Sequence, residues 1–320
     1  MINNEIIEPR NNFDVIIIGG GPAGLTSGIY AARDGLNVLL IEKISVGGQI
    51  FLSENVENYP GIEKISGADL TGIMEKQAKK FGVNFVFEDV IKVEEKDDKK
   101  VVYTTSSGIY SSTALIIATG TRHKELNIPG EAGFKGHGVS NCATCDAAFY
   151  KNLDVAVIGG GDTAVQEALF LTKFVNKVYL IHRRDSLRAT KIIQEKAFKN
   201  AKIQFIFDTV ADEIIGDKNV NALKIRNVKT NEIKILPVNG VFIFIGSVPN
   251  TDFVKDLIIT DETGYIKTDI EMQTSRDGIF ACGDCIKKNL RQVVTAAGEG
   301  AIAAYNARLY MEKIKNTKLR

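Results

Sequence analysis

The pattern of hydrophobic positions contains the same unit twice. Residues 14–43 and 154–185 each begin with a short apolar run, pass through three glycines into an alanine-rich stretch, and end in a second apolar run. The two segments align without a gap, with Asp14 falling on Asp154. A strand-length run, a turn, a stretch with helical spacing and a second run indicate strand–turn–helix–strand. Each segment is therefore predicted to form a βαβ unit with two parallel strands.

The same pattern predicts further elements in both halves. A helix is expected over residues 66–81, and an alanine-rich amphipathic helix over 293–312. Residues 115–118 have the wholly apolar profile of a strand that is buried on both faces. Strands are expected over the remaining short apolar runs, at 83–94, 99–105, 113–118, 202–208, 222–228, 232–236 and 241–245.

The glycine turns carry a nucleotide-binding fingerprint. The GxGxxG run from Gly19 to Gly24 permits a tight turn, close approach of a pyrophosphate and close packing of helix on strand. Free N–H groups at the helix start would then face the phosphate charge. In the second copy, Gly159 and Gly161 are followed by Ala164, a tolerated variant at the third position. Two fingerprints in register predict two nucleotide sites.

The ends of the two second strands distinguish the ligands. The first strand ends in Glu42, where a carboxylate accepts hydrogen bonds from a ribose 2′-hydroxyl. The equivalent position of the second copy is His182, followed by Arg183, Arg184 and Arg188. A carboxylate there would repel a 2′-phosphate, whereas guanidinium groups bind it bidentately. The first site therefore suits FAD or NAD, and the second suits NADP(H).

The composition narrows the class of protein. Hydrophobic residues make up 44 % and charged residues 25 % of the 320 residues, with a formal net charge of +1. Without a basic excess, no nucleic-acid binding is expected, and no apolar run approaches the ~18 residues of a membrane span. The N-terminal residues 1–5 lack the order of a signal peptide, and four cysteines are too few for a secreted disulfide scaffold. We expect a cytoplasmic protein whose thiols are reduced by default.

Two cysteines three positions apart offer redox chemistry. Cys142 and Cys145 within one helical turn can reach disulfide geometry, and a helix N-terminus lowers the pKa of one thiol. Asp146 follows directly and could give or take a proton during thiol–disulfide exchange. From the residues alone, the pair is a redox dithiol, half of a zinc site, or two inert buried thiols.

A second pair, Cys282 and Cys285, bears on the zinc alternative. The two pairs are much farther apart than the ~15–20 residues usual in a zinc site, so no metal is expected. Free cysteine packs as a small hydrophobe, which is the expected role of this pair. Asp284, between them, follows the apolar run 278–281 and could contact the polyol of a nucleotide-like cofactor.

With these motifs placed, the chain resembles the low-molecular-weight (bacterial and archaeal-type) thioredoxin reductases of the FAD/NADPH pyridine nucleotide-disulfide oxidoreductases, almost from end to end. The resemblance implies a redox-active centre formed by Cys142, Cys145 and Asp146. The implied FAD-binding residues are Gly19, Gly21, Pro22, Ala23, Glu42, Lys43, Gly48, Gln49, Asn58, Gly283, Asp284, Arg291, Gln292 and Val293. The implied NADPH-binding residues are Gly159, Gly161, Asp162, Thr163, Ala164, His182, Arg183, Arg184 and Arg188. The chain departs from the usual pattern at Ala147, Cys282 and Cys285, where Gly, Ala and Val are more common.

The resemblance also implies the architecture. We expect an α/β protein with two Rossmann-like, three-layer (ββα) nucleotide-binding domains, the NADPH domain inserted into the FAD domain. Residues 1–123 and 254–320 would form the FAD domain, and residues 124–253 the NADPH domain with its dithiol. Hinges near 122–125 and 247–252 would let the inserted domain present first the nicotinamide and then the dithiol to the flavin.

The implied activity is that of an NADPH-dependent thioredoxin-disulfide reductase, acting as a homodimer. A hydride would pass from NADPH to FAD, electrons then to the Cys142–Cys145 disulfide, and the dithiol would exchange with oxidised thioredoxin. By resemblance Cys145 faces the flavin, Cys142 attacks thioredoxin and Asp146 donates the proton. One alternative is a related flavin disulfide reductase that serves a glutaredoxin-like protein or a peroxiredoxin. A more distant one is a non-catalytic redox sensor that binds zinc or a nucleotide.

Overall fold

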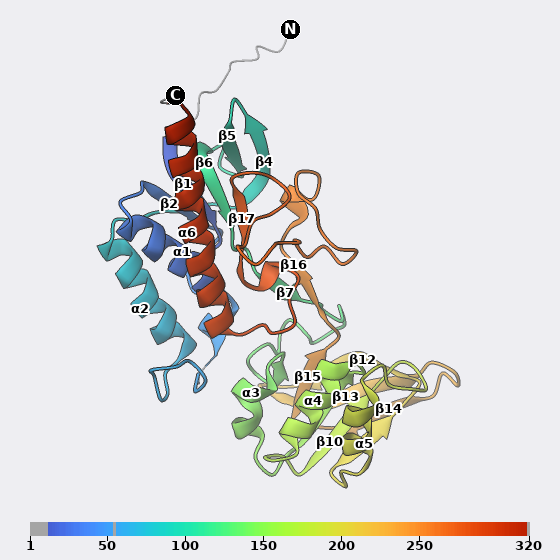
Figure 1. The fold of residues 1–320 in the computed structure, drawn as a ribbon. Coiled ribbons are helices and arrows are strands. Elements are labelled where there is room, and N and C mark those ends of the chain that lie inside the picture. The colour runs from blue at the N-terminus through green and yellow to red at the C-terminus, as the bar shows by residue number, and fades with distance from the viewer. Residues whose placement is uncertain (1–11, 54–55, 319–320) are drawn as a thin grey trace. The chain divides into compact units, whose positions relative to one another are not determined.

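A computed structural model describes residues 12–53 and 56–318 and divides the chain into two compact units (Figure 1). Unit 1 comprises Met1–Arg122 and Val248–Arg320, and unit 2 comprises His123–Ser247. The chain passes between the units through two short strands, β7 (Thr121–His123) and β16 (Ser247–Pro249), which pair with each other. Unit 2 is therefore an insertion in the sequence of unit 1.

Unit 1 is built on a mixed sheet with strand order β3-β2-β1-β6-β5-β4, and β17 also pairs with β6. The pairs among β3, β2, β1, β6 and β17 are parallel, whereas β6, β5 and β4 are antiparallel. The elements are β1 (Asn12–Ile18), α1 (Pro22–Arg33), β2 (Val38–Glu42), η1 (Gly48–Leu52), α2 (Gly67–Lys80), β3 (Asn84–Phe87), β4 (Val90–Lys96), β5 (Lys99–Thr104), β6 (Ile109–Ile117), η3 (Asp252–Val254), β17 (Ile279–Ala281), η4 (Gly283–Cys285) and α6 (Val293–Lys318).

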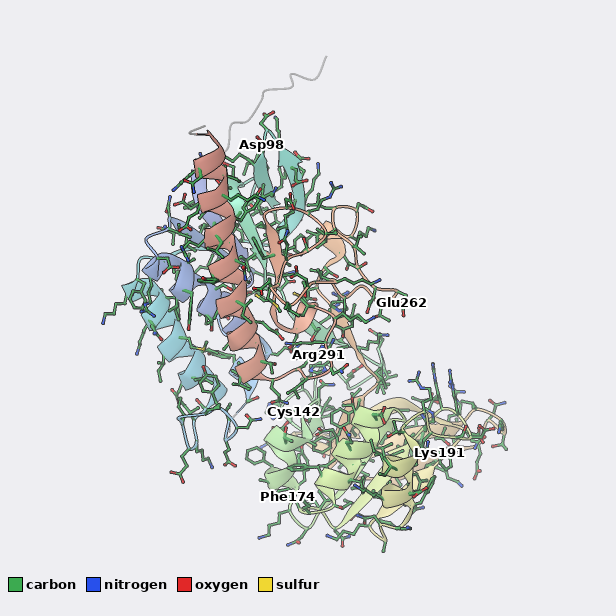
Figure 2. The ribbon with its side chains drawn as sticks, viewed as in Figure 1. Asp98, Cys142, Phe174, Lys191, Glu262 and Arg291 are labelled. Carbon is green, nitrogen blue, oxygen red and sulfur yellow. The ribbon has the colours of Figure 1, made fainter. Side chains whose placement is uncertain are left out.

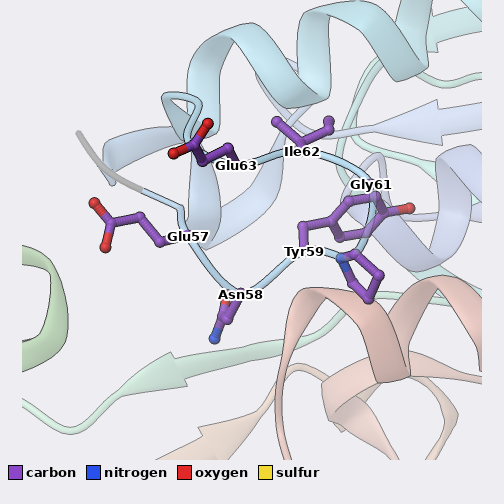
Figure 3. Close-up of a pocket in the computed structure, with 7 residues that line it drawn as sticks. Glu57, Asn58, Tyr59, Gly61, Ile62 and Glu63 are labelled. Carbon is purple, nitrogen blue, oxygen red and sulfur yellow. The ribbon is translucent and has the colours of Figure 1, made fainter.

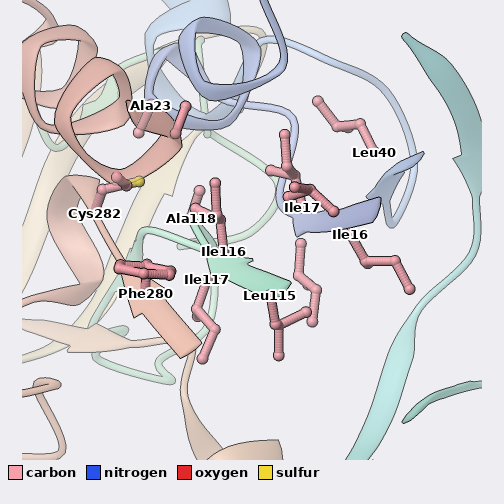
Figure 4. Close-up of a cluster of buried hydrophobic side chains, with 14 of the residues drawn as sticks. Ile16, Ile17, Ala23, Leu40, Leu115, Ile116, Ile117, Ala118, Phe280 and Cys282 are labelled. Atoms are coloured by element: carbon pink, nitrogen blue, oxygen red, sulfur yellow. The ribbon is translucent and has the colours of Figure 1, made fainter. Parts of the chain in front are cut away.

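The parallel strands of unit 1 are buried because helices cover them. Ile16 and Ile17 of β1 and Ile116 of β6 are fully buried in one continuous core (Figure 4). Burying each such side chain stabilises the fold by about 1.5–3 kcal/mol. α6 packs along α1, and a Cβ on Gly300 would lie 2.2 Å from the carbonyl oxygen of Ala23. Only glycine permits that close helix contact.

Unit 2 has three layers. A parallel sheet, ordered β11-β10-β9-β15-β8, has helices on one face and the antiparallel sheet β12-β13-β14 on the other. One apolar cluster joins the helices to the parallel sheet, and a second fills the space between the two sheets. The elements are β8 (Val139–Ser140), α3 (Ala143–Asp146), η2 (Ala147–Tyr150), β9 (Asp154–Gly159), α4 (Asp162–Leu171), β10 (Lys177–Ile181), α5 (Lys191–Phe198), β11 (Ile203–Ile206), β12 (Thr209–Gly216), β13 (Val220–Asn227), β14 (Ile233–Pro237) and β15 (Gly240–Phe244).

Both predicted βαβ units are confirmed, as β1–α1–β2 and β9–α4–β10. The single strand predicted over residues 83–94 was wrong, because β3 runs parallel to β2 whereas β4 is antiparallel to β5, and the chain has to change direction between them. β12 was not predicted, since the acids within it break the apolar run. Among the described residues, no helix is both long and apolar enough to cross a membrane.

Candidate functional site

The first glycine turn leaves a cradle, a space lined by backbone, which the side chain of any other residue type at these positions would fill. Gly19 has φ +107°, and a Cβ on Gly24 would lie 1.8 Å from the Gly19 carbonyl oxygen. Helix α1 starts with Pro22 and Ala23, and Gly21 at its N-cap has no side chain to bond the exposed N–H groups. Free N–H groups at a helix start attract an anion, and the missing side chains allow close approach. The turn therefore fits the pyrophosphate of a dinucleotide.

Glu42 closes this cradle at the end of β2. Its half-buried carboxylate accepts the N–H groups of Gly20, at 2.6 Å, and of Lys43, at 2.8 Å. The carboxylate is thus held beside the glycine turn, where a ribose hydroxyl would donate to it. The Lys43 ammonium instead pairs with Asp89 at 2.6 Å on the surface.

The segment after β2 packs against the same turn. The Gly47 N–H donates to the carbonyl oxygen of Gly20 at 2.8 Å, and a Cβ on Gly48 would lie 3.2 Å from the Gly21 Cα. The Gln49 side chain donates to the carbonyl and hydroxyl oxygens of Thr121. Gly48 and Gln49, predicted from sequence as cofactor residues, therefore lie at the edge of the cradle.

A pocket in unit 1 is lined by residues 57–63 (Figure 3). Within it, the Asn58 side-chain amide donates to the Gln292 Oε1 at 3.0 Å. Gln292 stands just before α6, next to Val293, its first residue. Two predicted flavin-side residues that are far apart in sequence are thus brought together.

The Asp284 carboxylate forms an ion pair with Lys288 but accepts no hydrogen bond at its Oδ1 atom. Its Oδ1 atom is buried and has no hydrogen-bond partner, although the Lys288 ammonium lies 3.2 Å away. Gly283, with φ +76°, packs its backbone against Ala23 at the start of α1. A polyol hydroxyl would satisfy this acceptor, so the residues present fit the ribityl part of FAD.

Glu299 and Lys288, which were not predicted from the sequence, contact Gly283 and Asp284. The Glu299 carboxylate accepts the Gly283 N–H at 2.9 Å and the Lys288 ammonium at 2.8 Å. Burial raises the pKa of Glu299, while the hydrogen bond from Lys288 opposes that shift. Arg291 lies over the ring of Tyr265, 4.3 Å from its centroid, and donates to the Asp284 carbonyl oxygen at 3.4 Å.

Cys282 and Cys285 belong to the core, as expected. Both are fully buried, and Figure 4 shows Cys282 together with Ala23 and Phe280. The Cys285 thiol lies 3.2 Å from the carbonyl oxygen of Cys282. Burial raises the pKa of Cys285 to about 11 and raises that of Cys282 as well. Burial therefore disfavours the thiolate, which is the reactive form of cysteine.

Backbone hydrogen bonds join the second glycine turn to the loop after β10, which carries Arg183, Arg184 and Arg188. The carbonyl oxygen of Gly160 accepts the N–H groups of Arg188, at 2.7 Å, and Ala189, at 3.2 Å. Asp162, in the first turn of α4, accepts the Thr190 N–H at 2.7 Å. The N-cap of α4 is Gly161, again without a side-chain bond, so this helix start also presents free N–H groups. Thr163 and Ala164 follow in the same turn.

The side chains at the end of β10 form a cationic cluster. His182 is 5 % exposed, and its ring lies where a Cβ on Gly160 would be, 2.3 Å from the ring atoms. Burial lowers the pKa of His182, and the charges of Arg188, Arg184 and Arg183 lower it further. These three arginines are exposed, and none forms an ion pair within the described part of the chain. Their guanidinium groups are therefore available to a 2′-phosphate.

The dithiol segment lies in the same unit, at α3. Cys142 precedes this helix (Figure 2) and is disulfide-bonded. The Cys145 backbone lies in α3, but its side chain is outside the part that the structure describes. The hydroxyl of Ser140, which no sequence signal pointed to, donates to Asp146 Oδ2 at 2.6 Å and accepts the Cys142 N–H at 3.0 Å. Asp146 is thus held close to the backbone of Cys142.

Two neighbours of α3 have altered acidity. Burial and the nearby charge of Asp146 raise the pKa of Tyr150 to about 12. Burial also raises the pKa of Glu167 on α4, and the nearby N–H groups of Ala143 and Thr144 oppose that shift. Among the described side chains, no three His, Cys, Asp or Glu residues lie close enough together to hold a metal ion.

Comparison with known proteins agrees with this geometry. The family model described as pyridine nucleotide-disulphide oxidoreductase matches residues 13–300. A thioredoxin reductase of Listeria innocua is 47% identical over 304 residues, covering 95% of this chain and 95% of that protein. One from Bacillus subtilis is 44% identical over 306 residues, covering 95% and 96%.

Solved structures give the same result. The crystal structure of a thioredoxin reductase from Streptococcus pyogenes has a TM-score of 0.83 and 46% identity, covering 94% of this chain and 99% of that one. One from Lactococcus lactis has a TM-score of 0.73 and 45% identity, with the same coverage. The chain therefore belongs to the pyridine nucleotide-disulphide oxidoreductases and, within them, to the low-molecular-weight thioredoxin reductases.

Proposed function

We propose that this protein is an NADPH-dependent thioredoxin-disulfide reductase, with FAD in unit 1 and NADPH in unit 2. One observation carries the proposal. The disulfide-bonded Cys142 lies in unit 2, together with the second glycine turn and the unpaired guanidinium groups after β10. Unit 1 has the first glycine turn, which the Glu42 carboxylate closes. A nicotinamide donor, a flavin and a dithiol are the parts that two-electron reduction of a protein disulfide requires.

In unit 1, main-chain and side-chain groups would divide the binding of FAD between them. The N–H groups of the Gly19–Gly24 turn would hold the pyrophosphate, Glu42 the ribose and Asp284 the ribityl chain. Bound FAD supplies the two-electron chemistry that links nicotinamide to disulfide. We assign Asn58 and Gln292, which bond each other, to the flavin ring.

In unit 2, the arginine cluster sets the choice of nicotinamide. Arg183, Arg184 and Arg188 would bind the 2′-phosphate of NADPH, which NADH lacks. Because the carbonyl oxygen of Gly160 accepts the Arg188 N–H, the phosphate clamp and the pyrophosphate cradle form one connected site. The free N–H groups at the start of α4 would hold the pyrophosphate itself.

The dithiol carries electrons to thioredoxin. We assign Cys145 as the disulfide partner of Cys142 and as the sulfur that faces the flavin, and Cys142 as the thiol that attacks thioredoxin. Asp146 would donate the proton, held in place by the Ser140 hydroxyl at 2.6 Å. The overall balance converts NADPH, one proton and thioredoxin disulfide into NADP⁺ and thioredoxin dithiol.

The assembly is also part of this proposal. Residues 1–123 and 254–320 would act as the FAD domain and residues 124–253 as the NADPH domain. We infer a cytoplasmic homodimer, as the resemblance implies. The balanced net charge of +1 supports the inference that it engages neither nucleic acid nor membrane.

Steady-state turnover of the purified protein tests the function. NADPH consumption with oxidised thioredoxin should be fast, and much slower with NADH or with a glutaredoxin-like protein or peroxiredoxin in place of thioredoxin. The visible spectrum should show bound flavin. A colourless protein, or one that prefers another disulfide partner, would contradict the assignment.

A further inference from the structure

Lys288, which follows η4, lies between two carboxylates in unit 1. Its ammonium is 2.8 Å from Glu299 Oε2 and 3.2 Å from Asp284 Oδ1. The side chains of Lys288 and Glu299 are only 10 % and 15 % exposed, so solvent and salt screen this pair less than a surface pair. Two carboxylates therefore share a single ammonium in a shielded place.

The ammonium treats the two carboxylates differently. It donates a hydrogen bond to Glu299 Oε2, whereas Asp284 Oδ1, although close by, is buried and accepts none. Lys288 thus compensates the charge of Asp284 without occupying this acceptor. A buried acceptor without a donor costs free energy, and a ribityl hydroxyl of FAD would supply the missing donor.

Glu299 is fixed in this place by a second hydrogen bond. The same Oε2 atom accepts the Gly283 N–H at 2.9 Å, which joins α6 to the start of η4. Gly283 in turn packs closely on α1, because a Cβ there would lie 2.9 Å from the Ala23 Cβ. The contact between Glu299 and Lys288 is therefore tied to the backbone that carries Asp284.

Arg291 does not take the place of Lys288. Its guanidinium group donates to the backbone carbonyl oxygens of Asp284, at 3.4 Å, and Ile286, at 3.5 Å. It also lies over the ring of Tyr265. None of these contacts involves the Asp284 carboxylate, and among the described residues Lys288 alone forms an ion pair with it. The position of the Lys288 ammonium therefore decides whether Asp284 Oδ1 is open.

We propose that Glu299 is a positioning residue for FAD, which holds the Lys288 ammonium off Asp284 Oδ1. Without the charge of Glu299, the ammonium turns to Asp284, its one remaining carboxylate, and occupies the oxygen that the ribityl hydroxyl needs. Glu299 acts through Lys288 and keeps a charge-compensated acceptor open for the cofactor. The inference rests on the proposed function in taking Asp284 as the residue that binds the ribityl chain.

The test is titration of the full-length, flavin-stripped protein with FAD at about pH 8, followed by flavin fluorescence. Glu299→Gln keeps an oxygen for the Gly283 N–H but removes the charge that holds Lys288. We expect the Kd for FAD to rise about tenfold, the loss of one hydrogen bond to a charged group. The matched control is Glu312→Gln, an exposed acid on the same helix that pairs with Arg308, and its Kd should not change. An E299Q Kd within about twofold of wild type overturns the proposal.

Removing the ammonium as well separates this role from a merely structural one. In the double variant Lys288→Met, Glu299→Gln, no ammonium competes for Asp284 Oδ1, so FAD should bind at least about threefold more tightly than to E299Q. If Glu299 only supported the fold, the losses from the two substitutions would add. A double variant that binds FAD no better than E299Q overturns the proposal.

Urea unfolding of the flavin-free proteins gives a second measurement. Lys288→Met should destabilise the wild-type chain more than the E299Q chain, because it leaves two carboxylates without their cation in the first and only one in the second. Equal destabilisation overturns the proposal.

Failure of the proposed function gives a different result. A wild-type protein that binds no FAD, or an Asp284→Ala variant that binds it as tightly as wild type, contradicts the FAD assignment and this inference with it. If wild type binds FAD and Asp284→Ala loses it, an unchanged E299Q contradicts the inference alone.

Discussion

Gly24→Ala should remove FAD from the protein while leaving unit 2 intact. A Cβ at this position would lie 1.8 Å from the carbonyl oxygen of Gly19, which is backbone and cannot rotate away. An ordinary non-bonded contact is about 3.5 Å, so the turn has to open by roughly 1.7 Å. Such overpacking costs about 3 kcal/mol, and because the opened turn is the pyrophosphate cradle, FAD affinity should fall roughly 100-fold.

The assay is retention of visible flavin absorbance during dilution and gel filtration, with an FAD titration of the stripped protein. Gly72→Ala is the matched control, since Gly72 lies in α2 with nothing within 4 Å of a built Cβ. Alanine is the better helix former, so this control should bind FAD normally and be stabilised by about 0.5–1 kcal/mol. If Gly24→Ala retains flavin as tightly as Gly72→Ala does, the argument from close approach at the turn is refuted.

Three further predictions concern unit 2. The double variant Arg183→Ala, Arg184→Ala should raise the KM for NADPH about 100-fold, because it loses two charge-assisted hydrogen bonds of about 1.5 kcal/mol each. The KM for NADH should change less than about threefold. Equal losses in steady-state kinetics with the two nucleotides would remove the 2′-phosphate assignment. Cys142→Ser should abolish thioredoxin reduction, yet NADPH should still bleach the flavin; normal thioredoxin turnover would show the dithiol assignment to be wrong. The pKa of His182 is lowered in the fold, so the unfolded chain binds the proton more readily than the folded chain does. The contribution of neutral His182 to the free energy of unfolding is therefore complete above about pH 6.5, and it is lost as the pH falls toward the folded pKa. Melting curves of His182→Gln should therefore depend less on pH than wild type over that window, and parallel curves would count against this account.

The parts of the molecule that repeat along the chain could be predicted from sequence. The two βαβ units follow from apolar runs and glycine spacing, and the different strand ends, Glu42 and His182, follow from alignment of the copies. The core role of Cys282 was also predicted correctly, because its surroundings are apolar in sequence as well as in space. Local patterns of this kind carry the fold because each βαβ unit is contiguous.

The supporting contacts of the site could not be predicted, because they join residues that no spacing relates. Glu299, within α6, accepts the N–H group of Gly283. Nothing in the sequence distinguishes Ser140 from other serines, and only the fold places its hydroxyl between Cys142 and Asp146. Each is a polar group whose partner is decided by tertiary packing, which a single sequence does not display.

The discontinuity of unit 1 has a consequence for biosynthesis. β17 pairs with β6, and α6 packs along α1, so the last part of the chain completes a layer begun by the first. Unit 2 is contiguous and can fold on the ribosome as soon as it emerges, whereas β6 gains its neighbour β17 only after all of unit 2 has been synthesised. A nascent chain would thus complete unit 2 before it can complete unit 1.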